Sequence, residues 1–166
     1  MSVSLISPAD AQDVQPRVDA KRDWSVFFAE DPKECWIVSA PSASTASRGG
    51  NTVTVNRGEI RLMVSIRPEA GRDNEVAFAG GYPFRPDSTV NVAIGSDSFD
   101  LYTENNGDEG WAWPANPEED GRVVDAMRRG VTAEITGLST RGTTTIDTFS
   151  LLGFTAALER ARELCG

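Results

Sequence analysis

The sequence predicts a mainly β protein: an antiparallel β-sandwich of about eight strands with two short helices, the last at the C-terminus. Three observations predict it. Apolar and polar residues alternate over several short runs, which is the period of a strand with one buried face. Gly, Pro, Asn and Asp separate these runs at the spacing of a sandwich or a partly open barrel. Two further segments carry apolar residues three and four apart, which is typical of amphipathic helices.

The clearest predicted strand is Glu59–Arg67, in which the even positions are all apolar and the odd positions are mostly polar or charged. Similar runs are Asp23–Ala29, Cys35–Ser39, Glu75–Gly80, Thr89–Ile94, Ser98–Thr103, Val131–Thr136 and Thr143–Leu151. The segment Ala40–Asn51 is rich in Ser, Ala and Gly, and we expect it to form a long mobile loop.

The first predicted helix begins at Asn116, an N-cap residue followed by Pro117 and two glutamates, and it ends at Gly130 after two arginines. The second predicted helix is Thr155–Leu164. Its apolar residues recur at helical spacing and place Cys165 on the face turned toward the sheet.

Residues 23–166 are predicted to form a single domain, and residues 1–22 lie outside it. Val3–Ile6 is mildly apolar, and Ala9–Ala11 has the small-x-small form of a signal-peptidase site. We therefore interpret the start of the chain as the tail of a signal peptide. Gln12–Arg22 would then be the disordered N-terminus of the mature protein.

The charge of the chain excludes some classes of partner. The formal net charge is −9 and the isoelectric point is about 4.5, which argues against nucleic acid as a partner because its phosphates require Lys and Arg. A basic protein is compatible with this charge. The sequence contains no apolar run long enough to span a membrane.

Catalytic and metal-binding motifs are also missing from the sequence. There is no histidine, which excludes Ser-His-Asp and Cys-His pairs, and two cysteines cannot build a Cys-only zinc site. Gly137–Thr144 superficially resembles a phosphate-binding loop, but it lacks the lysine, and a strand rather than a helix is predicted to follow. We expect a turn between strands there. The sequence thus predicts no enzyme, no metal site and no cofactor.

Trp111 and Trp113 lie within an acidic region from Glu104 to Asp120. Its carboxylates could serve a glycan hydrolase or calcium binding, but Glu109 stands where a calcium loop needs glycine. We favour a solvated acidic loop. The two tryptophans would share one face of a strand and could stack on a sugar or an aromatic ligand, although we expect them to cover the core.

Asp147 is predicted to be a buried carboxylate, because it shares a strand face with Phe149 and Leu151. A buried carboxylate needs a partner, which Arg141 or nearby backbone N–H groups could provide. We assign Arg141 and Asp147 a structural role.

Several short motifs follow one another along the chain: Asp23-Trp24, Cys35-Trp36, Gly81-Tyr82-Pro83-Phe84, Ser139-x-Arg141-Gly142, Asp147-x-Phe149-Ser150-Leu151-x-Gly153-Phe154, Ala157 and Cys165. Together they resemble the invasion-associated locus B family of alphaproteobacterial envelope proteins, over about Asp23 to Gly166. The resemblance implies export through a signal peptide to the periplasm or outer envelope. It implies no enzymatic activity, and founding members in pathogens are linked to host-cell entry. The chain departs from the family pattern in carrying only part of a signal peptide.

Export would place the two cysteines in an oxidising compartment. Cys35 and Cys165 are both predicted to face the interior, so the resemblance leads us to expect a disulfide between them.

The expected function is that of a non-enzymatic periplasmic or cell-envelope protein that binds a protein or another envelope component. Trp111, Trp113 and Tyr82 are its possible binding surface. One alternative is an acidic inhibitor or chaperone-like partner of a basic envelope protein. Another is a carboxylate-dependent glycan hydrolase.

Overall fold

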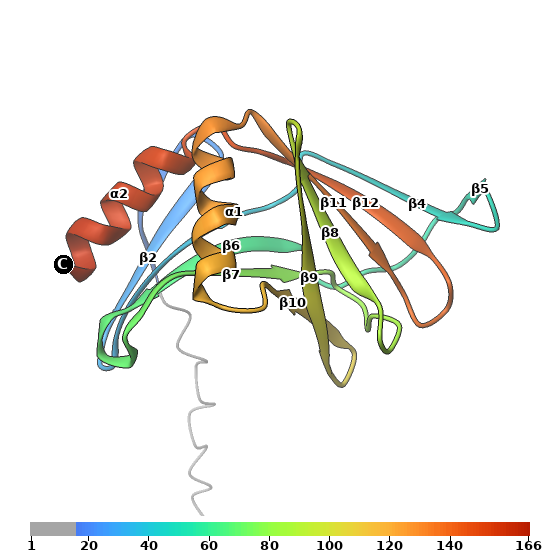
Figure 1. Cartoon of the computed structure of the whole chain (residues 1–166), viewed down its shortest axis with the longest axis horizontal. Helices are drawn as coiled ribbons and strands as arrows, with labels where there is room; N and C mark the ends of the chain where they lie inside the picture. Colours follow the sequence, from blue (N-terminus) through green and yellow to red (C-terminus); the bar gives the residue numbers. More distant parts are fainter. Residues whose placement is uncertain (1–15) are drawn as a thin grey trace, which may run out of the picture.

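The structure, a computed structural model, describes residues 16–166, which contain twelve β-strands, two α-helices and one short 3-10 helix (Figure 1). In chain order these are β1 (Arg17–Lys21), β2 (Trp24–Glu30), β3 (Lys33–Ser39), β4 (Ala43–Arg48), β5 (Asn51–Thr52), β6 (Arg61–Arg67), η1 (Pro68–Ala70), β7 (Arg72–Ala79), β8 (Thr89–Ile94), β9 (Asp97–Asn106), β10 (Glu109–Trp113), α1 (Pro117–Arg129), β11 (Thr132–Leu138), β12 (Thr144–Ser150) and α2 (Phe154–Cys165).

The predicted class, mainly β with an antiparallel sheet and two helices, is confirmed, but the eight-strand sandwich is wrong. The twelve strands form one sheet in the order β1-β2-β3-β6-β7-β10-β9-β8-β11-β12-β4-β5. The sheet curves strongly, so its two halves enclose a common interior (Figure 1). Alternation along each strand reveals which face is buried, but it does not reveal whether two facing layers belong to one sheet or to two.

The core lies on the inner face of this sheet. Phe78 of β7 meets Phe149 of β12 edge to face, with ring centroids 6.2 Å apart, so the two halves of the sheet contact each other directly. Helix α2 packs on β1, β2, β3 and β6, and α1 packs on β7. Trp24 and Phe154 form an edge-to-face pair at 5.0 Å between β2 and α2. Both helices therefore cover the half of the sheet that begins with β1.

Both helix predictions are confirmed. The side chain of Asn116 accepts a hydrogen bond from the Glu119 N–H at 3.0 Å, as an N-cap residue does. Helix α2 starts directly after Gly153, whose φ is 87° and whose position leaves no room for a side chain beside the Lys21 backbone. This close approach holds β1 against the start of α2.

The expected disulfide is present and joins β3 to α2. Cys35 and Cys165 are bonded, with Cα atoms 6.1 Å apart, and both residues are buried. Their placement on inward faces follows from the strand and helix periodicities.

Two predictions about irregular segments need correction. Arg17–Lys21 forms the edge strand β1, so this part of Gln12–Arg22 belongs to the folded domain. Ala40–Asn51, the expected mobile loop, contains β4, which pairs with β12. The sequence pattern did not indicate this strand, because only Ala46 of β4 is buried and its other residues show no alternation of apolar and polar side chains. The proposed cleavage site Ala9–Ala11 lies outside the described residues.

Within residues 16–166, none of the helices has the length and apolar character needed to cross a membrane.

Candidate functional site

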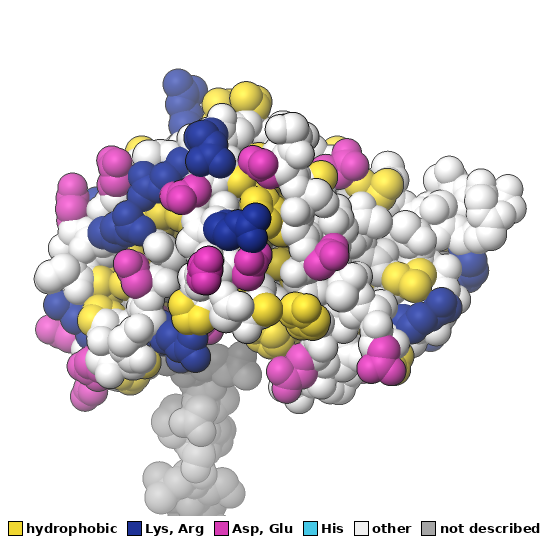
Figure 2. Space-filling model, in the orientation of Figure 1, with side chains coloured by type: hydrophobic (Ala, Val, Ile, Leu, Met, Phe, Trp, Pro, Cys, Tyr) yellow, Lys and Arg dark blue, Asp and Glu magenta, His cyan; other side chains and the backbone are white. Residues whose placement is uncertain are grey.

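A hollow of about 730 Å³ lies where the β11–β12 turn meets the segments before β6 and after β7. We call it the arginine pocket, because Arg48, Arg57 and Arg141 line it. Hydroxyl-bearing residues, among them Ser139 and Thr143, form much of the remaining wall. Figure 2 shows Lys and Arg side chains at the right-hand end of the molecule, below β4 and β5.

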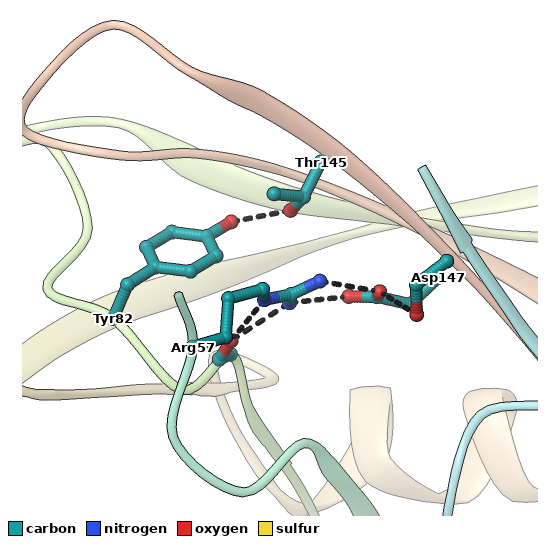
Figure 3. A network of polar contacts seen from close by, with 6 residues as sticks. Arg57, Tyr82, Thr145 and Asp147 are labelled. Carbon is teal, nitrogen blue, oxygen red and sulfur yellow. Dashed lines mark hydrogen bonds and ion pairs between the residues drawn. The ribbon is translucent and has the colours of Figure 1, made fainter. Parts of the chain in front are cut away.

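Arg57, which lines the arginine pocket, belongs to a buried ion pair with Asp147 behind the pocket wall (Figure 3). Asp147 is fully buried on β12, and Arg57 donates two hydrogen bonds of 2.7 Å to its two carboxylate oxygens. Ser44 donates a third at 2.7 Å, and Arg57 also donates to the Gly80 carbonyl. These bonds compensate both charges for their loss of water. The ion pair thereby fixes the segment before β6 against β12.

Tyr82 forms the side of the pocket next to this pair (Figure 3). The Arg57 guanidinium lies 5.0 Å from the centre of its ring, a cation–π contact. Its hydroxyl shares a hydrogen bond with Thr145. Burial raises the pKa of the Tyr82 hydroxyl, so it stays neutral at physiological pH. A side chain at Gly137 would strike the Tyr82 hydroxyl, so glycine at that position admits the ring.

Neither of the two partners considered for Asp147, Arg141 or nearby backbone N–H groups, is the one that the structure shows. Asp147 is buried as expected, but its partner is Arg57, while Arg141 is exposed on the β11–β12 turn and lines the pocket. Sequence reasoning missed Arg57 because it lies 90 residues from Asp147, in a segment between β5 and β6 that forms no strand. A buried carboxylate on β12 could have signalled that some cation must reach it, but not which one.

The β11–β12 connection is a turn between strands, as predicted for Gly137–Thr144. Within it, the Ser139 hydroxyl accepts a hydrogen bond from the Thr143 N–H at 3.1 Å. Arg48 of β4 donates two bonds to the Thr143 hydroxyl, at 2.7 and 3.1 Å. The turn therefore presents ordered hydroxyl groups toward the pocket.

The second candidate site is the outer face of β10. Trp111 and Trp113 lie there, half-buried, with nearly parallel rings 6.1 Å apart, and Arg61 lies 5.3 Å from the ring centre of Trp111. The expectation that they cover the core is wrong. Gly110 and Ala112 occupy the inward positions of β10, so the alternation turns both indoles outward. We call this surface the tryptophan face.

A shallow hollow of about 520 Å³ runs along the tryptophan face. Its lining combines Met63 and the two tryptophans with polar side chains such as Glu104 and Asn105. A smaller cavity of about 250 Å³ borders Trp113 and Asp120. The face is therefore aromatic at its centre and acidic at its edge.

Asp120 is the most unusual acid of this region. It is 6% exposed, and its carboxylate accepts a hydrogen bond from the Val76 N–H at 2.9 Å. Burial raises its pKa to about 6, and the nearby Glu75 adds to the effect, while Arg72 opposes it. Within residues 16–166, no three His, Cys, Asp or Glu side chains form a group that could hold a metal ion.

The structure separates the predicted binding residues. Trp111 and Trp113 lie together, whereas Tyr82 is buried in the wall of the arginine pocket. A further stacked pair on the outer face, Phe27 and Trp36, was missed. These residues face each other across β2 and β3, a pairing that strand alternation alone does not give.

No family model matches the sequence, and no curated protein matches it. The fold is similar to that in the crystal structure of invasion associated protein B from Bartonella henselae. The TM-score is 0.57 at 12% sequence identity, over 88% of this chain and 96% of that chain. At this identity the likeness establishes a common fold.

Proposed function

We propose that this chain is an exported, non-enzymatic binding protein of the cell envelope, and that a protein partner contacts its tryptophan face. The observation that carries the proposal is the stacked pair Trp111–Trp113, which lies outside the core on a half-exposed sheet face. Tryptophan, methionine and arginine are enriched in protein interfaces; Met63 lines the same hollow as the two tryptophans, and Arg61 lies over the Trp111 ring.

The stacking geometry favours a protein over a saccharide at the centre of this face. The Trp111 ring is already in contact with both Arg61 and Trp113, so less of its surface is open for a sugar ring to stack on. The ring edges and the adjacent shallow hollow suit an apolar side chain from a partner. A protein interface of this kind usually has polar residues around its aromatic centre. Around the rim of the tryptophan face, most of the charged residues are acidic.

The acidic rim supports a second candidate, a chaperone-like or inhibitory role toward a basic envelope protein. Glu34, Glu75 and Glu104 line the hollow together with Arg67, which pairs with Glu75, and the chain carries a net charge of −9. Such binding would weaken steeply with salt, because exposed charges are screened within about 10 Å at 0.1 M salt. The carboxylate-dependent hydrolase is the third candidate, and the raised pKa of Asp120 is its only support.

Export is supported by three features taken together. These are the family resemblance of the sequence, the likeness of the fold to invasion associated protein B, and the Cys35–Cys165 disulfide. A periplasmic fraction from native cells should contain the chain without free thiols after unfolding in the absence of reductant. Two free thiols per chain in protein taken from such cells would contradict export.

The test of the binding face is affinity capture with Trp111→Ala/Trp113→Ala, followed by binding measurements with the purified captured protein. We expect the double substitution to weaken binding at least about tenfold, because interface tryptophans often contribute more than 1.4 kcal/mol each. The matched control is Val131→Ala/Leu152→Ala, which removes two apolar side chains that are 70% and 57% exposed away from this face. Equal loss in both double variants, or no loss in the first, would refute the proposed face.

A further inference from the structure

The arginine pocket is a separate feature from the tryptophan face, and its charge is opposite to that of the protein. Three arginines line it in a chain whose net charge is −9, and Asp108 is the one carboxylate among the described lining residues. Asp147 lies behind the wall and compensates Arg57. The remaining positive charge comes from Arg48 and Arg141.

These two guanidinium groups are available to a ligand. Among residues 16–166, neither Arg48 nor Arg141 takes part in an ion pair. Two guanidinium nitrogens of Arg48 donate hydrogen bonds to the Thr143 hydroxyl, and these bonds fix the position of the Arg48 side chain. The third guanidinium nitrogen makes no hydrogen bond within the described residues. Arg141 extends from the turn on the neighbouring part of the rim.

The buried hydroxyl groups of the wall also have hydrogens to donate. Ser139 and Thr143 are 7% and 3% exposed, and each hydroxyl oxygen accepts a hydrogen bond, but within residues 16–166 neither donates one. Tyr82 and Thr145 share a single bond, so one of their two hydroxyl hydrogens is also unused by the protein there. A pocket wall with unused hydrogen-bond donors is suited to a ligand that carries many hydrogen-bond acceptors.

We propose that the arginine pocket binds an oxyanion, a phosphate or carboxylate group, carried by a hydroxyl-bearing ligand of saccharide size. Guanidinium groups recognise both anions through charge-assisted hydrogen bonds, and the surplus hydroxyls complete the donor set. A volume of about 730 Å³ lies within the range of small-molecule sites. The site does not depend on the proposed partner at the tryptophan face.

The test is isothermal titration of the full chain with four probes: glucose 6-phosphate, glucuronate, inorganic phosphate and glucose. We expect binding of at least one charged sugar and none of glucose. Binding of inorganic phosphate without binding of either charged sugar would contradict a ligand of saccharide size. Arg48→Gln/Arg141→Gln should raise the Kd at least about tenfold, since both substitutions remove charge-assisted hydrogen bonds to the anion.

Two further variants keep the test specific. Arg129→Gln removes the same charge at an exposed position away from the pocket, paired with Asp97 at 3.7 Å, and should leave the Kd unchanged. Asp108→Asn removes the one lining carboxylate and should tighten binding about two- to threefold, as expected for an exposed charge pair. Thermal unfolding confirms that each variant is folded. Absence of binding by every charged probe, or an equal loss in Arg129→Gln, would overturn the proposal.

Discussion

The two halves of the sheet are closed by different chemistry. The half formed by β1, β2, β3, β6 and β7 is covered by apolar side chains of α1 and α2 and is tied by the Cys35–Cys165 disulfide. In the other half, four of the seven buried polar residues of the described chain lie between Ser139 and Asp147. An apolar cover tolerates substitution, whereas a polar interior is stable only while every group is paired.

This difference indicates where specificity resides. The apolar half holds the fold together, and the tryptophan face lies at its border, on the outer surface of β10 next to β7. In the polar half, the Arg57–Asp147 pair is an interior contact, and Arg57 also lines the arginine pocket. Stability and ligand access are thus coupled in one half of the molecule and separate in the other.

The largest loss of stability should follow from removing the disulfide of the apolar half. Cys35→Ala/Cys165→Ala removes a crosslink between residues 130 positions apart, and in the chain-entropy view the free energy of unfolding should fall by about 5 kcal/mol. Urea denaturation of the oxidised protein and of the variant measures this. Wild-type protein treated with reductant is the control and should unfold like the variant. A midpoint that does not move would show that α2 is held by packing alone.

The polar half should be almost as sensitive to a single atom change. Asp147→Asn leaves the Arg57 charge buried without its counter-ion, and we expect a loss of about 3–5 kcal/mol of unfolding free energy. Arg57→Leu/Asp147→Leu removes both charges and should recover much of that loss in the same denaturation assay. If the double variant is less stable than Asp147→Asn, the hydrogen bonds of the pair stabilise the fold beyond cancelling the two charges. Pairing of charge would then not be what limits the stability of the polar half.

A smaller, pH-dependent effect should appear where the two halves meet, at Asp120. Its pKa rises from 3.8 to about 6 on folding, so the folded state favours the protonated acid. This stabilisation is fully present below pH 4 and is lost as pH rises through 6, by at most about 3 kcal/mol. Asp120→Asn keeps the acceptor for the Val76 N–H without titrating. The wild type should therefore lose stability relative to this variant between pH 4 and 7, and a constant difference would contradict the shift.

The sequence was sufficient for the parts of the fold that depend on local periodicity. The inward side chains of β6, both helix starts and the inward cysteines follow from spacing along one element. It was insufficient for β4, which has little apolar alternation and is held by its hydrogen bonds to β12. The single curved sheet depends on strand order, which no local pattern encodes.

The candidate sites were predictable to a smaller degree. Burial of Asp147 followed from Phe149 two residues on, but its partner Arg57 is 90 residues away in the chain, and no local pattern shows that the two meet. For Trp111 and Trp113, the shared strand face was correct and its direction was wrong. Because Gly110 and Ala112 have little or no side chain, the sequence did not indicate that these positions of β10 face the core. They can do so because a large ring, that of Phe84, occupies the space beside Gly110.

The strand order also dictates when this molecule can close. β4 follows β3 after a few residues, yet it joins the sheet only beside β12, and the Ser44–Asp147 contact spans 103 residues. During synthesis, β4 therefore cannot pair with β12 until almost the whole domain has been made. Such long-range contacts slow folding, typically to milliseconds or longer. The polar half of the molecule can therefore be completed only after β12 has been synthesised.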